Sequence, residues 1–230
     1  MLVKDFRVLN RRHEAIKELC NRFIPENSTI FEIGCGVGII TKHLQQRASN
    51  MVAVDISEEN IRVAKMFASS PICIFEVVDI VENITSLTAM GKFQNIVLAD
   101  TIEHIPKEKH AVLFDHLLQL LNPGGLIFIT FPSPQYQAYL MDNYPETMQI
   151  IDEVVTINDL LACTSLDMLY FSYRDIWGGN QYIHLVLRNG IEYLPENPEI
   201  RTIFEKICFN IRNIKWRLRN YFFLKKLQDV

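Results

Sequence analysis

The sequence predicts an α/β protein with a doubly wound, Rossmann-like sheet of seven mostly parallel strands and helices on both faces. Two observations support this fold class. Strand-like and helix-like segments alternate from Thr29 to Pro132, which is typical of a parallel sheet. A glycine-rich turn at residues 34–38 joins the first strand to the helix that follows it. The length of 230 residues suits one α/β domain with additional segments.

The expected elements follow from the spacing of apolar residues. Apolar side chains at helical spacing predict a first helix over residues 5–23. Ser57 has the properties of an N-cap for a helix at 58–67, whose first turn is acidic. A further helix is expected at 156–162. Short apolar runs bounded by turn residues predict strands at 29–33, 51–57, 72–78, 95–99, 126–132, 166–173 and 181–187, with the last strand forming a hairpin.

The turn after the first strand reads Gly34-x-Gly36-x-Gly38. Glycines at such a turn let the backbone bend sharply and let a ligand approach the peptide groups. The dinucleotide-binding fingerprint would require glycine at position 39, which is Ile39. Glu32 precedes the first glycine by two residues. This segment alone is compatible with a ligand-binding turn and with a purely structural one.

Acidic residues end the next predicted strands. Asp55 lies about 20 residues beyond the glycine turn, where a carboxylate can accept hydrogen bonds from both hydroxyls of a ribose. Asp79 and Asp100 follow the third and fourth strands. Because ligands of parallel sheets bind at the carboxyl ends of the strands, we expect these side chains at one site. The alternative for Asp55 and Asp79 is a structural carboxylate at a strand end.

Two further strings complete the pattern. Glu103-His104-Ile105-Pro106 follows the fourth strand, and Asn122-Pro123-Gly124-Gly125 precedes the fifth. With the glycine turn and the strand-end acids, in this order, they resemble the class I S-adenosylmethionine-dependent methyltransferases over about residues 10 to 190. The Glu-His-Ile-Pro string is similar to a branch that includes the ubiquinone-pathway O-methyltransferases and many small-molecule methyltransferases.

The resemblance implies S-adenosyl-L-methionine as the cofactor, with its adenine beside Asp79. The sulfonium methyl group is already an activated electrophile. The protein must then align an acceptor and, for a hydroxyl acceptor, remove a proton. The cofactor-binding residues that the resemblance implies are Glu32, Gly34, Cys35, Gly36, Gly38, Asp55, Ile56, Asp79, Ile80 and Asp100.

His104 is the candidate general base, because imidazole can exchange a proton near neutral pH. Its alternative role is to pack at the start of the following helix and bond a backbone carbonyl. A further alternative is a metal site, because Asp100-x-x-Glu103-His104 resembles the acid-x-x-Glu-His cluster of metal-dependent relatives. His184 could add a ligand to that cluster. The metal itself stays unassigned.

Residues 133–153 interrupt the alternation and are rich in tyrosine and methionine. We interpret this segment as a lid or acceptor-binding insertion, which suits an aromatic or apolar acceptor. His13, in the N-terminal helix, is interpreted as part of a solvated helix face. Contact between His13 and the acceptor is the alternative.

Composition and cysteine usage limit the class of protein. Hydrophobic residues make up 49% and charged residues 22%, which indicates a globular chain. The five cysteines are scattered without metal-ligand spacing, which favours a reducing compartment. The sequence lacks a signal-peptide core and any apolar run of about 18 residues. We expect a cytoplasmic protein, with peripheral membrane contact left open.

The last part of the chain has a different character. A methyltransferase domain is expected over residues 1–197, and 198–230 is predicted to be a basic amphipathic helical extension. Such a helix can pack on its own domain or a second copy, bind an acidic protein, or lie on an anionic membrane, and nucleic acid is disfavoured. Residues 201–226 hold one acid, Glu205, and eight basic residues: Arg201, Lys206, Arg212, Lys215, Arg217, Arg219, Lys225 and Lys226.

Three functions remain open from the sequence. The first is methyl transfer to a small-molecule hydroxyl or amine. The second is methyl transfer to a membrane-associated acceptor such as a quinone, a lipid or a lipid-linked sugar. The third is an RNA-directed or non-catalytic member of the fold. Intact cofactor motifs argue against a non-catalytic role, so we predict a small-molecule methyltransferase with an aromatic or apolar acceptor.

Overall fold

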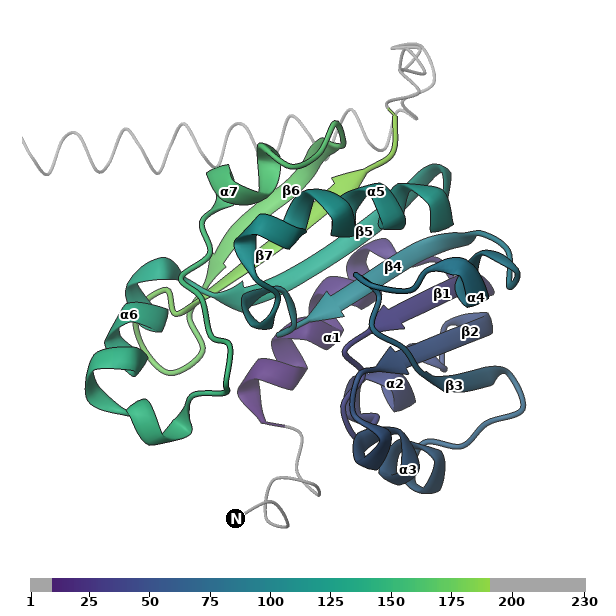
Figure 1. The fold of residues 1–230 in the computed structure, drawn as a ribbon, viewed down its shortest axis with the longest axis horizontal. Helices are drawn as coiled ribbons and strands as arrows, with labels where there is room; N and C mark the ends of the chain where they lie inside the picture. The colour runs from purple at the N-terminus through teal and green to yellow at the C-terminus, as the bar shows by residue number, and fades with distance from the viewer. Residues whose placement is uncertain (1–9, 191–230) are drawn as a thin grey trace, which may run out of the picture. The chain divides into compact units, whose positions relative to one another are not determined.

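The computed structural model describes residues 10–190. Seven strands form one sheet in the order β3-β2-β1-β4-β5-β7-β6 (Figure 1). All neighbouring pairs from β3 to β5 are parallel, and β7 runs antiparallel to both β5 and β6. The predicted fold class is therefore confirmed. The strands are β1 Ser28–Ile33, β2 Ala48–Asp55, β3 Cys73–Val77, β4 Phe93–Ala99, β5 Leu121–Pro132, β6 Asp167–Arg174 and β7 Tyr182–Arg188.

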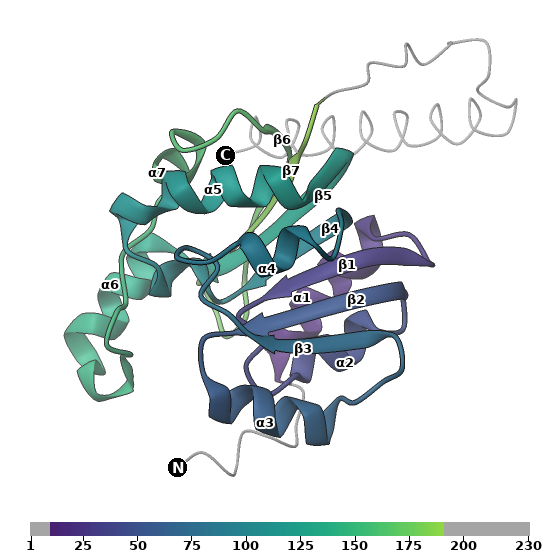
Figure 2. The ribbon, with the colours of Figure 1, turned by 45° about the vertical axis from the view of Figure 1, so that its right-hand side comes forward.

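Helices cover both faces of this sheet (Figure 2). The strands alternate with helices along the chain, and the helices that connect parallel strands lie on the faces of the sheet. One face packs against α1, α2 and α3, with Leu19 of α1 and Ile30 of β1 in a common core. The other face packs against α5, with Phe31 of β1 and Phe114 of α5 in a second core. The helices are α1 Arg11–Phe23, α2 Ile39–Leu44, α3 Glu58–Phe67, α4 Thr85–Thr88, α5 His110–Leu120, α6 Pro134–Asn143 and α7 Ile157–Leu161.

Local sequence signals explain several boundaries. The Ser57 hydroxyl accepts a hydrogen bond from the Asn60 N–H at 3.2 Å, which confirms the predicted cap of α3. Helix α1 begins after Asn10, whose side chain caps the backbone N–H of His13 at 2.9 Å. The His13 side chain is 9% exposed, so the interpretation of a solvated helix face is wrong. The cap draws this side chain back over the helix start, where it also approaches the Asn10 N–H.

The predicted turn at Asn122–Gly125 lies inside β5 instead of before it. Leu121 pairs with Phe93 of β4, and Leu126 pairs with Asn95, so the residues between them form a bulge in the ladder. Gly124 has a φ of +73°, a conformation that favours glycine. The predicted extension 198–230 and the first residues of the expected 5–23 helix lie outside the described residues.

Candidate functional site

A cavity of about 520 Å³ opens where β1, β2 and β4 end. The strand order reverses between β1 and β4, and open α/β sheets bind ligands at such switch points. The volume is within the range of small-molecule sites. The turns after β4 and the segment after α6 supply the remaining walls. The predicted site residues that line the cavity are Gly34, Gly36, Asp55, Ile56, Asp79, Ile80, Asp100 and His104.

The three glycines of the turn meet different surroundings. All three have positive φ angles, +70° at Gly34, +53° at Gly36 and +87° at Gly38. A Cβ atom at Gly34 would lie 2.3 Å from the hydroxyl oxygen of Thr101, and one at Gly38 would lie 3.0 Å from Ala68 Cβ. A Cβ at Gly36 would meet no atom within 4 Å. Gly34 and Gly38 are thus needed for packing, whereas Gly36 keeps the cavity open.

Asp55 holds the turn as well as facing the cavity. One carboxylate oxygen accepts the Gly36 N–H at 2.8 Å. The other accepts the Ser57 N–H at 2.9 Å and the Asn60 side-chain amide at 3.2 Å. The residue is 9% exposed. The structural role and the ligand-binding role that the sequence left as alternatives are therefore compatible in one side chain.

Three residues of the predicted set do not line the cavity: Glu32, Cys35 and Gly38. Glu32 is 2% exposed and points into the interior behind the turn. Burial, together with the negative charge of Asp55, raises the pKa of Glu32 to about 8, although the Thr41 hydroxyl opposes this shift. Burial likewise raises the pKa of the Cys35 thiol. Burial thus favours the neutral form of both side chains, and neither side chain lines the cavity.

Asp79 and its neighbours form the far wall. One Asp79 carboxylate oxygen accepts the Val81 N–H at 2.9 Å and the Glu82 N–H at 3.4 Å. Ile56 is 75% exposed at the rim, whereas Ile80 is buried. Ile56, Asp79 and Ile80 all line the cavity, so this wall combines two isoleucines with one acidic residue. Such a wall suits a flat base with an exocyclic amine.

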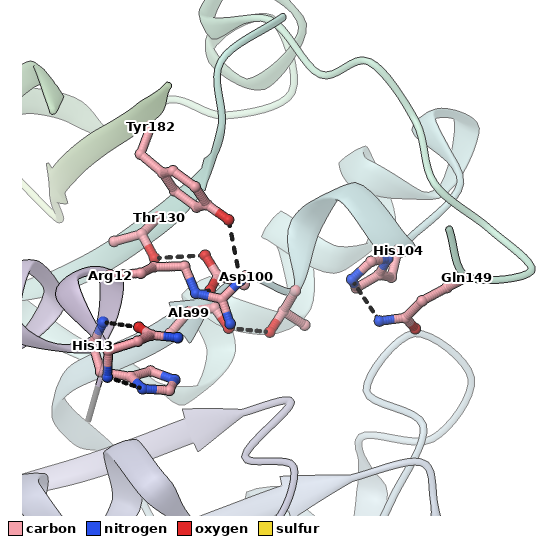
Figure 3. Close-up of polar contacts among 10 residues, drawn as sticks. Arg12, His13, Ala99, Asp100, His104, Thr130, Gln149 and Tyr182 are labelled. Carbon is pink, nitrogen blue, oxygen red and sulfur yellow. Dashed lines mark hydrogen bonds and ion pairs between the residues drawn. The ribbon is translucent and has the colours of Figure 1, made fainter. Parts of the chain in front are cut away.

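Asp100 is the centre of a charged cluster that the sequence did not predict (Figure 3). Its carboxylate lies 2.9 Å from the Arg12 Nε in a close ion pair that is not aligned as a hydrogen bond. Arg12 also donates a hydrogen bond to the Tyr182 hydroxyl at 3.1 Å. The backbone of Asp100 has a φ of +52°, which is strained for a residue other than glycine. The cluster thus joins α1, the end of β4 and the start of β7.

Glu103 lies beside this cluster without a countercharge of its own. Burial, and after it the charge of Asp100, raises the pKa of Glu103 well above its usual range. Burial also raises the pKa of Asp100, but Arg12 opposes that shift. Arg12 therefore favours the charged form of Asp100, whereas burial favours the protonated form of Glu103. No described residue bonds the second carboxyl oxygen of Glu103.

His104 has a defined tautomer. Its Nδ1 lies 3.0 Å from the backbone carbonyl oxygen of Ile151, which can only accept, so Nδ1 carries the hydrogen. Its Nε2 lies 2.9 Å from the side-chain nitrogen of Gln149, which donates, so Nε2 presents its lone pair (Figure 3). Asp152 lies 3.2 Å from Nδ1. The predicted carbonyl contact is present, and it leaves the other ring nitrogen able to accept a proton.

Among the described residues, His184 does not form a metal-ligand group with His104 and Asp100. No group of three or more histidine, cysteine or acidic side chains converges on a metal-sized site within residues 10–190. His184 is 2% exposed on β7, and burial lowers its pKa to about 4. Asp100 is paired with Arg12 instead of with a cation. The described side chains therefore do not support the metal cluster that the sequence left as an alternative.

The depressed pKa of His184 predicts a pH dependence of stability. The unfolded chain binds a proton at this residue near pH 6.5, and the folded chain does so near pH 4. The contribution of neutral His184 to the free energy of unfolding is thus fully present above pH 6.5. It falls by about 3 kcal/mol as the pH is lowered from 6.5 to 4. Chemical unfolding at pH 8, 6 and 4.5 should show that His184→Gln flattens this decline. A variant with the wild-type pH slope would contradict the assignment.

Aromatic side chains gather beside the charged cluster. The Tyr136 ring of α6 lies 6.2 Å from Tyr182, 6.1 Å from Trp177 and 6.4 Å from Tyr139. Tyr136 and Tyr139 also line a second cavity of about 520 Å³, between α6 and the loop before β7. The predicted insertion 133–153 thus supplies aromatic side chains here and Gln149 at the first cavity. The contact between Arg12 and Tyr182 could not be predicted from local sequence patterns, because 170 residues separate them.

A doubly wound sheet with a glycine turn and strand-end acids around one cavity defines an α/β protein that binds a nucleotide-like cofactor. The sequence matches the methyltransferase domain family over residues 8–175. The chain therefore belongs to this family, and the predicted resemblance to the class I S-adenosylmethionine-dependent methyltransferases is confirmed.

Curated relatives share about a quarter of their aligned residues with the chain. The ubiquinone biosynthesis O-methyltransferase of Colwellia psychrerythraea is 28% identical over 112 residues, covering 49% of this chain and 45% of that protein. The mitochondrial enzyme of the same name from Dictyostelium discoideum is 27% identical over 125 residues, covering 50% and 38%. The chain thus matches less than half the length of these two relatives.

Solved structures share the fold at low identity. A methyltransferase from Anabaena variabilis superposes with a TM-score of 0.65 at 19% identity, over 82% of this chain and 90% of that one. The N-methyltransferase NodS from Bradyrhizobium japonicum, in complex with S-adenosyl-L-homocysteine, gives a TM-score of 0.63 at 17% identity, over 79% and 89%. Identities this low show the shared fold alone.

Proposed function

We propose that the chain transfers a methyl group from S-adenosylmethionine to the hydroxyl or amine of a small acceptor with an aromatic or apolar body. One observation carries this proposal. Gly36, Asp55 and His104 all line one cavity, and the Nε2 of His104 lies 2.9 Å from the side-chain nitrogen of Gln149, which lines the same cavity. The family match and the two named O-methyltransferase relatives support the class of reaction.

The residues of the cavity fit this cofactor. A side chain at Gly36 would occupy space that the turn keeps open, as a close backbone approach to a ligand requires. Asp55 supplies a carboxylate for the ribose hydroxyls, and the cavity wall with Ile56, Asp79 and Ile80 suits the adenine. The cofactor, when bound, supplies the activated methyl group. Arg12 and Asp100 add a positive and a negative side chain beside the cavity, which match the carboxylate and the ammonium of the methionine portion.

His104 is placed to remove the proton of a hydroxyl acceptor. In the described conformation Gln149 donates to Nε2, and an acceptor hydroxyl would take the place of that amide. The proton would then move from the acceptor oxygen to Nε2. The Ile151 carbonyl and the Asp152 carboxylate, both near Nδ1, stabilise the resulting imidazolium. The base is therefore held by groups from the 133–153 segment.

The aromatic cluster around Tyr136 is the proposed wall for the body of the acceptor. Tyr182 connects it to Arg12 and Asp100 at the cofactor cavity. Tyr136, Tyr139 and Tyr173 line the second cavity, whose lining contains no charged side chain. Ring faces without charges favour aromatic or apolar ligands. This supports an uncharged acceptor body.

An acceptor panel tests the proposal. Full-length protein with radiolabelled S-adenosylmethionine is incubated with phenols, catechols, aromatic amines, aliphatic alcohols and amino sugars. We expect label transfer to one aromatic class, with a KM that rises about tenfold or more in Tyr136→Leu while the affinity for S-adenosylhomocysteine stays unchanged. Tyr170→Leu, which removes a tyrosine of β6 that packs beside Phe23 and lines neither of these two cavities, is the matched control. Transfer only to RNA or protein would contradict the proposal.

The glycine turn yields a matched pair of variants. Gly36→Ala is expected to remain folded, with about 1 kcal/mol of stability lost to its positive φ, and to bind S-adenosylhomocysteine at least about tenfold more weakly, because its methyl group would enter the cavity. Gly34→Ala is expected to lose about 2 kcal/mol or more of unfolding free energy, because its methyl group would overlap Thr101. Calorimetry and chemical unfolding separate the two effects. Wild-type affinity in Gly36→Ala would remove the turn from the site.

A membrane-associated acceptor is the second candidate. The two named relatives act in ubiquinone biosynthesis by name, and the basic, amphipathic pattern of residues 201–226 suits an anionic surface. Within the described part of the chain, no helix is long and apolar enough to cross a membrane. Full-length protein should then co-sediment with anionic vesicles at low salt and be released at high salt. Equal sedimentation with neutral vesicles, or none with either, would contradict this candidate.

A further inference from the structure

A further cavity of about 480 Å³ lies at the opposite end of the strands from the cofactor turn. Its walls come from the starts of β1 and β4, the bulge in β5, the end of β7 and the residues after α1. The methyltransferase chemistry uses none of these residues. The cavity therefore needs its own explanation.

Two buried nitrogen donors at this cavity have no partner among the described residues. Asn95, on β4, is 2% exposed, and its side-chain Nδ2 bonds no described group. The buried Nε of Arg188, at the end of β7, is in the same situation. A buried donor without an acceptor costs about 1–3 kcal/mol, more for a charged group. Two such donors in one cavity suit a bound ligand that supplies hydrogen-bond acceptors.

Three other polar groups of this cavity are already engaged. The side-chain oxygen of Gln94 accepts the Thr29 N–H at 2.9 Å, and the Ser28 hydroxyl donates to the Pro25 carbonyl at 2.7 Å. The backbone carbonyl of Asn122 accepts a hydrogen bond from Asn189 at 3.3 Å. The cavity lining includes a cation, Arg188, and no acidic side chain. Its donors consequently favour a ligand that carries negative charge and acceptor oxygens.

The remaining walls are apolar. Phe23, Leu126 and Leu169 contribute side chains, and Leu169 is 46% exposed at the rim. Two prolines and two glycines complete the surface. An inorganic anion would leave these walls without contacts. A ligand with a carboxylate at one end and an apolar body at the other would satisfy both parts.

We propose that this cavity binds a small organic monoanion, a carboxylate with an aromatic or aliphatic body. The carboxylate accepts from Asn95 Nδ2 and Arg188 Nε, and the body packs on Phe23 and Leu126. The formal net charge of the chain is −4, so a general attraction of anions does not account for such binding. The positive charge must be local, and Arg188 supplies it.

The test uses benzoate as the probe on full-length protein, with benzamide as its neutral analogue and inorganic phosphate as an anion without an apolar body. We expect benzoate to shift the side-chain amide resonance of Asn95 in two-dimensional NMR spectra. Benzamide and phosphate should bind at least about tenfold more weakly, because each lacks one of the two contacts. Phosphate binding alone, or equal binding of benzoate and benzamide, would overturn the proposal.

Two variants locate the binding. Arg188→Gln and Asn95→Leu should each weaken benzoate binding about tenfold or more. Lys92→Gln removes an exposed positive charge at the same end of the sheet and should leave binding unchanged. S-adenosylhomocysteine affinity confirms that each variant is folded, and Arg188→Gln carries the test if Asn95→Leu does not fold. Wild-type benzoate affinity in Arg188→Gln would overturn the proposal.

Discussion

Replacing His104 by alanine is expected to lower kcat at least about 100-fold with a hydroxyl acceptor, while the affinity for S-adenosylhomocysteine stays near normal. The reason is geometric. Ile151 and Asp152 fix the Nδ1 hydrogen, so Nε2 is the atom that accepts the proton. The measurement is kcat from label transfer under saturating cofactor, together with calorimetry of S-adenosylhomocysteine binding.

His104→Gln separates proton removal from packing. Glutamine can still donate a hydrogen bond to the Ile151 carbonyl, but it cannot take up a proton near neutral pH. If His104 acts as the base, this variant should be as slow as His104→Ala, and both should recover activity with a more acidic phenol that is already ionised. Full activity in His104→Gln would show that the residue only packs.

Replacing Asp55 by alanine is expected to weaken S-adenosylhomocysteine binding about 10-fold to 100-fold or more. Each hydrogen bond from a ribose hydroxyl to a carboxylate contributes about 1.5–3 kcal/mol before compensation. The same substitution leaves the Gly36 and Ser57 N–H groups without their acceptor, so unfolding free energy should fall by about 1–3 kcal/mol as well. Calorimetry gives the first effect, and chemical unfolding gives the second.

Asn60→Ala, at a residue that also lines the cavity, is the matched variant for Asp55→Ala. It removes one donor to the Asp55 carboxylate but leaves that carboxylate and its two backbone partners in place. We expect it to lose some stability and to bind S-adenosylhomocysteine within about threefold of the wild type. An Asp55→Ala variant with unchanged affinity would remove this carboxylate from the cofactor site. Its role would then be limited to the turn.

Chelation distinguishes metal-independent methyl transfer from a mechanism that needs a divalent ion. The described side chains do not form a cluster for a divalent ion, and Asp100 is paired with Arg12. Chelator treatment should therefore leave label transfer unchanged. Loss of activity that added magnesium or zinc restores would support the alternative Asp100–Glu103–His104 metal site instead.

Much of this protein could be predicted from local sequence. Apolar runs that alternate with helical segments specify a parallel sheet. The residues that directly follow each strand then lie close together at the carboxyl edge of that sheet. Gly36 and Asp55 were therefore predictable as neighbours although 19 residues separate them, and the Gly36 N–H does bond the Asp55 carboxylate. The N-cap Ser57 was predictable for a different reason, because its hydrogen-bond partner, Asn60, lies only three residues further along the chain.

Only the tertiary structure decided which side chains face the cavity and which long-range partners they have. Glu32 and Cys35 belong to the predicted motif, but the strand and the turn direct both side chains into the interior, where burial favours their neutral forms. Arg12 meets Tyr182 across 170 residues, and Gln149 meets His104 across 45. No periodicity or motif links such positions, because α1 and the 133–153 segment are placed by packing on the finished sheet. The sequence by itself thus determined the fold, the family and the cofactor turn, whereas packing determined the ion pair of Asp100 with Arg12 and the contacts of the two His104 ring nitrogens.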